Sequence, residues 1–138
     1  MIKHKISQKD QEYFESFKAF KIKPEAFHHR EHIRIAYILL AELSVEQAFI
    51  TLKDDLLSFL DFIGAGKSKY HETMTYAWLL AVNHFMNKCS PCSSSDEFID
   101  SNKILLDKDI MYTHYSRELI ESDNARMIFV QPDLELIP

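Results

Sequence analysis

Glycine is scarce in this chain, and that scarcity restricts the fold more than any other feature of the sequence. Only two glycines and four prolines occur among the 138 residues. Sheet-rich folds use glycine in their tight turns, so this sequence favours helices joined by short loops. Hydrophobic residues make up 46% of the chain, which is enough to build a globular core. We therefore predict one all-α domain over residues 1–138.

Hydrophobic spacing divides the chain into about six helices that form a compact bundle. Apolar residues recur at helical intervals over about 8–20, 25–43, 45–62, 70–88, 95–106 and 109–121. The second segment is apolar almost all round, which is typical of a central helix with neighbours on several sides. Residues 123–138 are predicted to form an extended tail whose apolar side chains pack on the bundle.

Charge and hydropathy exclude several classes of partner. The net charge is −5, so we expect neither a nucleic-acid footprint nor a polybasic patch for anionic lipid. The longest uninterrupted apolar run, residues 35–41, is too short to span a bilayer. The N-terminus lacks the apolar stretch of a secretory signal. We expect a cytoplasmic bacterial protein whose partner is a small-molecule ligand or substrate, with no nucleic acid and no membrane.

Histidines at two predicted helix starts suggest a candidate site. His29 and His32 are three residues apart, so both project from one face of the second helix. His71 and Glu72 open the fourth helix, and the stripe that continues from His71 faces inward. If these helix starts meet, three imidazoles and a carboxylate would suit a divalent transition metal such as Zn or Fe. A zinc-bound water would favour hydrolysis, whereas iron would favour oxidation.

Two other interpretations of the same residues stay open. Neutral imidazoles would also suit a pocket for a small polar or anionic ligand that binds without turnover. Alternatively, the histidines are structural, since a buried polar group without a partner costs roughly 2–7 kcal/mol and the fold must supply one. Glu72 would then only place negative charge in the first turn of its helix, where it is favoured.

Other short patterns in the sequence are less specific. Cys89 and Cys92 form a C-x-x-C pair, which we interpret as a loop with two unrelated cysteines because no second ligand pair accompanies it. Residues 28–32 match the H-x-x-E-H signature of certain zinc peptidases, but those enzymes carry a β-sheet that this chain is not expected to form. The sequence does not decide whether His28 or His114 joins the site.

Three segments resemble an uncharacterised family of small bacterial helical proteins. They are residues 27–36 (FHHREHIRIA), 70–75 (YHETMT) and 125–134 (ARMIFVQPDL), and the pair 115–116 (YS) matches as well. The polar positions of the family's motifs fall on His29, His32, Arg34, His71, Glu72, Thr73, Tyr115, Arg126 and Asp133. The resemblance implies a shared polar site and no particular reaction. Because His28 falls on a variable position, we prefer His29 with His32 as the metal-binding pair.

The resulting hypothesis is a small metal-dependent enzyme, hydrolytic or oxidative, and the alternative is a non-catalytic binding module for a polar or anionic ligand. The predicted site comprises metal ligands His29, His32, His71 and Glu72, catalytic groups Glu72, Tyr115 and Arg126, and ligand contacts Arg34 and Thr73. In the enzyme, Glu72 is the fourth ligand or the general base, and Tyr115 and Arg126 orient the substrate.

Overall fold

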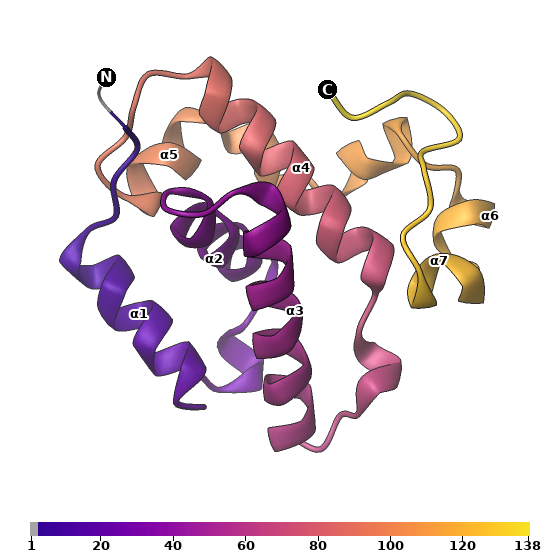
Figure 1. Ribbon diagram of the computed structural model, residues 1–138, viewed down its shortest axis with the longest axis horizontal. Coiled ribbons are helices and arrows are strands. Elements are labelled where there is room, and N and C mark those ends of the chain that lie inside the picture. The colour runs from indigo at the N-terminus through magenta and orange to yellow at the C-terminus, as the bar shows by residue number, and fades with distance from the viewer. Residues whose placement is uncertain (1–2) are drawn as a thin grey trace.

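The computed structural model describes residues 3–138, and within that range the chain is all-α with no strand, as the sequence predicts (Figure 1). The α-helices are α1 (Gln8–Lys18), α2 (His29–Leu40), α3 (Val45–Phe62), α4 (Glu72–Lys88), α5 (Ser95–Ser101), α6 (Arg117–Ile120) and α7 (Asp123–Met127). The 3₁₀ helices are η1 (Pro24–Ala26), η2 (Lys67–Lys69), η3 (Lys103–Leu106) and η4 (Lys108–Thr113). None of the described helices is both long enough and apolar enough to cross a membrane.

Helix α2 is the centre of the bundle. It contacts α1, α3, α4 and α5, which surround it in Figure 1. Seven of its residues, from Ile33 to Leu40, are buried. Burial on several sides explains why this segment is apolar almost all round, as the sequence predicts for a central helix.

A glycine-containing loop joins α3 to α4 and lets the two helices pack side by side. Helix α3 starts at a capping box in which the Ser44 hydroxyl accepts from the Gln47 amide. After α3 the chain turns through Gly64 and Gly66, whose φ angles are 75° and 79°. Side chains with a Cβ are strained at such angles, so the chain's two glycines occupy positions that require them. The loop then returns through η2 to the start of α4.

A buried carboxylate fixes the N-terminal helix to the bundle. Asp10 is 1% exposed and accepts hydrogen bonds from the Ser95 amide and hydroxyl and from the Ser7 amide. The guanidinium of Arg34 on α2 donates to it as well, at 3.1 Å. Burial alone would raise the pKa of Asp10, but the hydrogen bonds outweigh it and lower the pKa overall. The group is therefore an ionised link between α1, α2 and α5.

The C-terminal third departs from the predicted helices. The segment predicted as one helix over 95–106 is α5 followed by η3, and the segment over 109–121 is η4 followed by α6. Residues 123–138, predicted as an extended tail, begin with α7 and are non-helical after it. Ser116 divides the second of these segments, because its side chain accepts a hydrogen bond from the Leu119 amide and starts α6. Asp107 and Ser122 start η4 and α7 in the same way.

The end of the chain is fastened beside the N-terminal half of α4. The Thr73 hydroxyl donates to the Ile128 carbonyl and accepts from the Val130 amide. The Tyr115 hydroxyl donates to the Val130 carbonyl at 2.7 Å. Figure 1 shows the consequence, since α6, α7 and the tail gather at the end of α4 that is far from α1. The tail is therefore attached to the bundle, as predicted, but four of its apolar side chains are exposed and do not pack there: Met127, Ile128, Leu134 and Leu136.

Candidate functional site

A cavity of about 650 Å³ opens beside α2, α3 and the first half of α4. Pockets for small molecules have volumes of roughly 300–1,000 Å³, so this cavity is of ligand size. Its apolar wall includes Phe27, Ala36, Leu52, Leu56, Phe59, Leu60, Ile63, Met74, Trp78 and Leu79. Its polar side chains include His28, His29, His32, Lys69, His71, Thr75 and Lys108. Among the described residues that line it, none is acidic.

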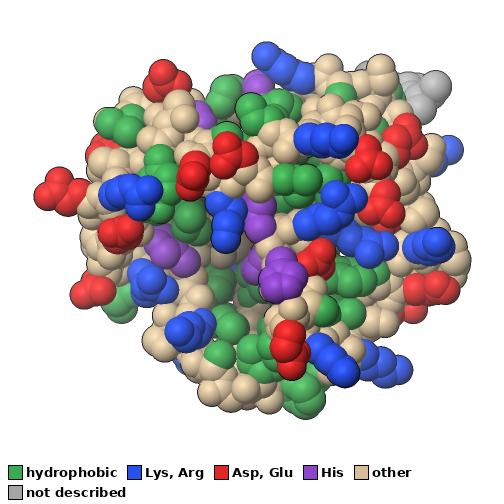
Figure 2. Space-filling model, turned by 180° about the vertical axis from the view of Figure 1, so that it is seen from behind, with side chains coloured by type: hydrophobic (Ala, Val, Ile, Leu, Met, Phe, Trp, Pro, Cys, Tyr) green, Lys and Arg blue, Asp and Glu red, His purple; other side chains and the backbone are tan. Residues whose placement is uncertain are grey.

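Basic side chains gather at the mouth of this cavity. Lys69 and Lys108 line the cavity and are also exposed, which places them where it meets solvent. Figure 2 shows histidines on this face among lysine, arginine and acidic side chains, around a hollow that has apolar groups in it. The two lysines place positive charge at the entrance, while most of the lining is apolar.

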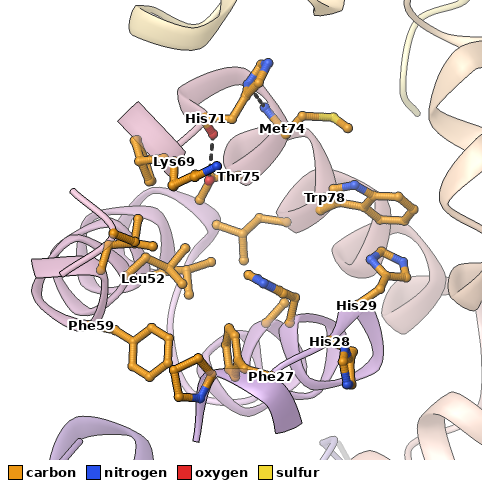
Figure 3. A pocket seen from close by; sticks show the side chains of 18 of the residues that line it. Phe27, His28, His29, Leu52, Phe59, Lys69, His71, Met74, Thr75 and Trp78 are labelled. Atoms are coloured by element: carbon orange, nitrogen blue, oxygen red, sulfur yellow. Dashed lines mark hydrogen bonds between the residues drawn. The ribbon is translucent and has the colours of Figure 1, made fainter. Parts of the chain in front are cut away.

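His29 is held by one ring nitrogen and leaves the other available. Its Nε2 lies 2.8 Å from the Leu105 carbonyl, so Nε2 carries the proton and Nδ1 carries the lone pair. The ring stacks edge-on against Trp78, with 4.5 Å between centroids (Figure 3). Burial lowers the pKa of His29 and outweighs the hydrogen bond to Leu105, which raises it. The imidazole is therefore neutral near pH 7.

His32 has no hydrogen-bond partner in the described part of the chain. Its ring lies 4.4 Å from the ring of Phe27 and contributes to the cavity lining. Many protein atoms lie near the His32 ring, but the residue is exposed to solvent because the ring faces the open cavity. Burial and the neighbouring His29 lower the pKa of His32 to about 4. Both nitrogens of this neutral ring are free to meet a ligand.

His71 lines the cavity, but its polar atoms are already engaged. Nδ1 accepts from the Met74 amide at the start of α4, and Nε2 donates to the Ile120 carbonyl at 2.7 Å. Figure 3 shows the ring turned away from His29. Burial lowers the pKa of His71, with a smaller contribution from Arg126. In this arrangement His71 caps a helix and has no free lone pair for a metal ion.

Glu72, predicted as a metal ligand and catalytic group, is not among the residues that line the cavity. Its carboxylate forms an ion pair with Lys53 at 3.0 Å and accepts from the Tyr70 hydroxyl, also at 3.0 Å. These contacts join α3 to the start of α4. The carboxylate would have to leave both partners to reach an ion at His29 and His32.

The remaining predicted site residues have structural partners, and the cavity lining includes none of them. Thr73 and Tyr115 hold the tail by the hydrogen bonds given above. Arg126 donates to the carbonyls of Ser68 and Tyr70, and Arg34 pairs with Asp10. Asp133 accepts from the amide and hydroxyl of Ser116. Their roles in substrate binding or catalysis stay predictions.

Three cavity residues lie outside the predicted site: Trp78, Lys69 and Lys108. Trp78 packs against the apolar core and also lines the cavity. The two lysines come from η2 and η4, segments distant in sequence from the histidines. No local pattern indicates that they share a cavity with His29, since only the packing of the chain brings them together.

The four predicted metal ligands do not form one cluster. In residues 3–138, the group of three or more His, Cys, Asp or Glu side chains with ligand atoms mutually within 4.8 Å is a different one, His4, Cys89 and Cys92. His28 lines the cavity mouth, whereas His114 bonds the Glu135 carbonyl and is not part of the lining. No family model, curated protein or solved structure matches this chain, so the family resemblance of the three motifs stays a prediction.

Proposed function

We propose that the protein binds a small amphipathic acid, with an apolar body inside the cavity and a carboxylate or similar anion at its mouth. One observation carries this proposal: the cavity has a long apolar wall, lysines at its entrance and no acidic residue in its described lining. Burial of apolar ligand surface contributes roughly 25 cal/mol per Å² and would supply most of the affinity. Specificity for an anion would come from the few polar groups.

His29 and His32 suit this ligand because burial lowers the pKa of each ring and keeps it neutral near pH 7. An uncharged imidazole can donate one hydrogen bond and accept another without burying a charge. His32 has both nitrogens without partners, and His29 has its Nδ1 lone pair. Lys69 and Lys108 supply the positive charge from the solvent side, where an ammonium group keeps its hydration. An acid with a hydroxyl or carbonyl near its carboxylate would bond to the histidines through that group and to the lysines through the carboxylate.

Trp78 offers a direct measurement of binding, because it is the chain's one tryptophan and it lines the cavity. We expect straight-chain and aromatic carboxylic acids to change its fluorescence and to raise the melting temperature. The matching primary amides, which have the same body and no charge, should bind more weakly. At 100 times its dissociation constant a ligand stabilises the fold by about 2.7 kcal/mol.

Substitution of the two lysines at the cavity mouth tests how much their charge contributes to the affinity for acids. Lys69→Met and Lys108→Met should each weaken acid binding by about fivefold at most, since an exposed ion pair contributes up to about 1 kcal/mol. Lys88→Met is the matched control, because Lys88 is exposed at the end of α4 and is not in the lining. Equal affinity for acids and amides, or no response to either series, would reject the proposal.

A metal-dependent enzyme, hydrolytic or oxidative, is the second candidate, and the tautomer of His29 favours it. Metal-binding histidines commonly donate one ring N–H to a carbonyl and ligate through the other nitrogen. His29 has this arrangement through Leu105, and His32 lies three residues further on the same helix. These two rings would hold a Zn or Fe ion. Water and the bound substrate would complete its coordination.

Metal analysis of protein reloaded with Zn²⁺ or Fe²⁺ separates the two candidates. We expect His32→Ala to lose any ion at this site. His71→Asn serves as the matched control, since asparagine can still cap α4 and the native ring has no free lone pair. Loss of metal in the His71 variant, with retention in the His32 variant, would contradict this ligand set.

A further inference from the structure

We propose that His4, Cys89 and Cys92 form a separate site for a thiophilic metal ion such as Zn²⁺. One ligand atom of each lies within 4.8 Å of the others. Cys89 and Cys92 are both free thiols, so neither sulfur is consumed by a disulfide. This site is independent of the His29 and His32 cavity.

The three ligands come from separate parts of the chain that the fold brings together. Cys89 is the C-cap of α4, Cys92 follows in the loop before α5, and His4 belongs to the N-terminal segment. Cys89 is partly exposed and lines a cavity of about 430 Å³, which His4 also lines. An ion can therefore reach Cys89 from solvent, and water can occupy a fourth position.

His4 has the tautomer that ligation through Nδ1 requires, although a backbone amide occupies that lone pair, as in His71. Unlike His71, it has two cysteine sulfurs within 4.8 Å. Its Nε2 lies 2.6 Å from the Met86 carbonyl, so Nε2 carries the proton. Its Nδ1 accepts from the Cys92 amide at 3.0 Å, so Nδ1 carries the lone pair and is directed at the cysteine loop. Donation of the second ring N–H to a carbonyl is the usual way in which a metal-bound imidazole is oriented. When Nδ1 binds the ion, the Cys92 amide would lose its hydrogen bond to His4 and would donate to water.

The donor set selects soft or borderline ions. Two thiolates and one imidazole suit Zn²⁺ or Cu⁺ and disfavour Mg²⁺ or Ca²⁺. Zn–S and Zn–N bonds of about 2.3 and 2.1 Å put tetrahedral ligand atoms about 3.6–3.8 Å apart, so the three groups would close by roughly 1 Å at most. Each thiol gives its proton to solvent as the ion binds, which makes affinity rise with pH.

A bound ion would tie the N-terminal segment to the rest of the bundle. That segment already pairs with the cysteine loop, because the Lys5 amide donates to the Cys92 carbonyl at 2.8 Å. The Tyr37 hydroxyl on α2 donates to the carbonyls of Lys5 and Cys92. Coordination would add a cross-link at this junction, so the ion should raise the melting temperature and protect the segment from proteolysis.

Co²⁺ added to the fully reduced protein tests the site, because sulfur-to-cobalt charge-transfer absorption reports thiolate ligands only. We expect one Co²⁺ per chain, displacement by Zn²⁺, and slower alkylation of Cys89 once Zn²⁺ is present. Cys89→Ser should lower Zn²⁺ affinity by more than the roughly 10–100-fold that loss of an outer hydrogen-bond partner costs. His32→Ala is the control and should keep the absorption, because it lies in the other cavity.

The alkylation measurement needs no variant, so it decides the question even if a substitution impairs folding. Absence of charge-transfer absorption, together with an alkylation rate that Zn²⁺ does not change, would overturn the proposal. Unchanged charge-transfer absorption in Cys89→Ser would also overturn the proposal, because Cys89 would then not be a ligand. Co²⁺ that binds without charge-transfer absorption, and that is lost in His32→Ala but not in Cys89→Ser, would assign the ion to the other cavity.

Discussion

Among the cavity side chains, the chemistry of His32 depends most on its surroundings. His29 and His71 both donate to backbone carbonyls, whereas His32 has no hydrogen bond among the described residues and lies against the ring of Phe27. Burial therefore lowers its pKa to about 4 without compensation from hydrogen bonds. A neutral ring with two unused nitrogens is the feature on which both proposed functions depend.

The lowered pKa of His32 predicts a pH dependence of stability. An unfolded histidine titrates near pH 6.5 and folded His32 near pH 4, so between these values the unfolded state binds more protons. The free energy of unfolding should therefore fall as the pH drops from 6.5 towards 4. Denaturant unfolding of His32→Leu at pH 7 and pH 5 should show a smaller fall than the wild type shows.

Some pH dependence should persist in that variant, since burial also lowers the pKa of His29 and His71. Comparison at pH 7, where these rings are neutral, separates the packing effect of leucine from the titration effect. An identical fall in both proteins would show that protonation of His32 is as easy in the folded state as in the unfolded one.

Asp10 is predicted to be the most sensitive single polar residue for stability. Asp10→Ala would leave Arg34 and the amide and hydroxyl of Ser95 without their buried partner. Removal of one member of a buried, hydrogen-bonded ion pair costs about 3–5 kcal/mol. Urea unfolding should show this loss, while the control Asp96→Ala, at an exposed ion pair with Arg30, should change stability by about 0.5 kcal/mol or less.

At the scale of elements, the loop between α3 and α4 forms one wall of the ligand cavity and depends on α7 for its position. Ile63, Ala65 and Lys69 of this loop line the cavity. Arg126 on α7 donates to the Ser68 carbonyl at 3.0 Å and to the Tyr70 carbonyl at 3.5 Å. Arg126, predicted to orient a substrate, thus reaches the cavity only through the loop that it holds.

Arg126→Ala should loosen this wall. We expect a loss of about 1 kcal/mol in stability, faster amide exchange over residues 64–70, and weaker binding of any ligand in the cavity. Amide hydrogen exchange of the variant provides the measurement. Arg117→Ala is the matched control, because Arg117 is exposed and its guanidinium lies against Tyr112 and Glu121, away from the loop. Unchanged exchange in the loop would mean that Arg126 does not position it.

At the scale of the whole molecule, the buried apolar residues form two clusters. The larger one unites α1–α5 around α2 and includes Phe17, Tyr37 and Phe98. The smaller one consists of Ala77, Met111, Tyr115 and Ile120, and it joins the C-terminal segments to α4. Because burial of apolar surface is the main source of stability, the second cluster should hold its region less firmly.

Native-state hydrogen exchange should therefore resolve two levels of stability. Amides of α2 and the middle of α4 should exchange only through global unfolding. Amides of η4, α6 and α7 should exchange through a local opening of lower free energy, because these elements are short and bury few apolar groups. One common free energy for both sets would indicate that the two clusters unfold as a single unit.

The sequence by itself determined the class of fold and most of the longer helices. Ser44 with Gln47 predicts the start of α3, and the apolar pattern over residues 33–40 predicts a central helix, because caps and helical spacing act over a few neighbouring residues. It also indicated that His29 and His32 share one face. Local chemistry was less informative in the C-terminal third, where both expected helices break and Ser116 caps a new one inside the second.

Only the tertiary structure decided which polar groups meet. His71 and Glu72 have the sequence context of a site, yet Ile120 and Lys53, far along the chain, take their polar atoms. Lys69 and Lys108 joined the cavity, and His4 joined Cys89 and Cys92, by contacts that no local pattern encodes. A hydrogen bond or an ion site requires atoms within a few ångströms of one another, and for residues distant in sequence only packing sets that distance.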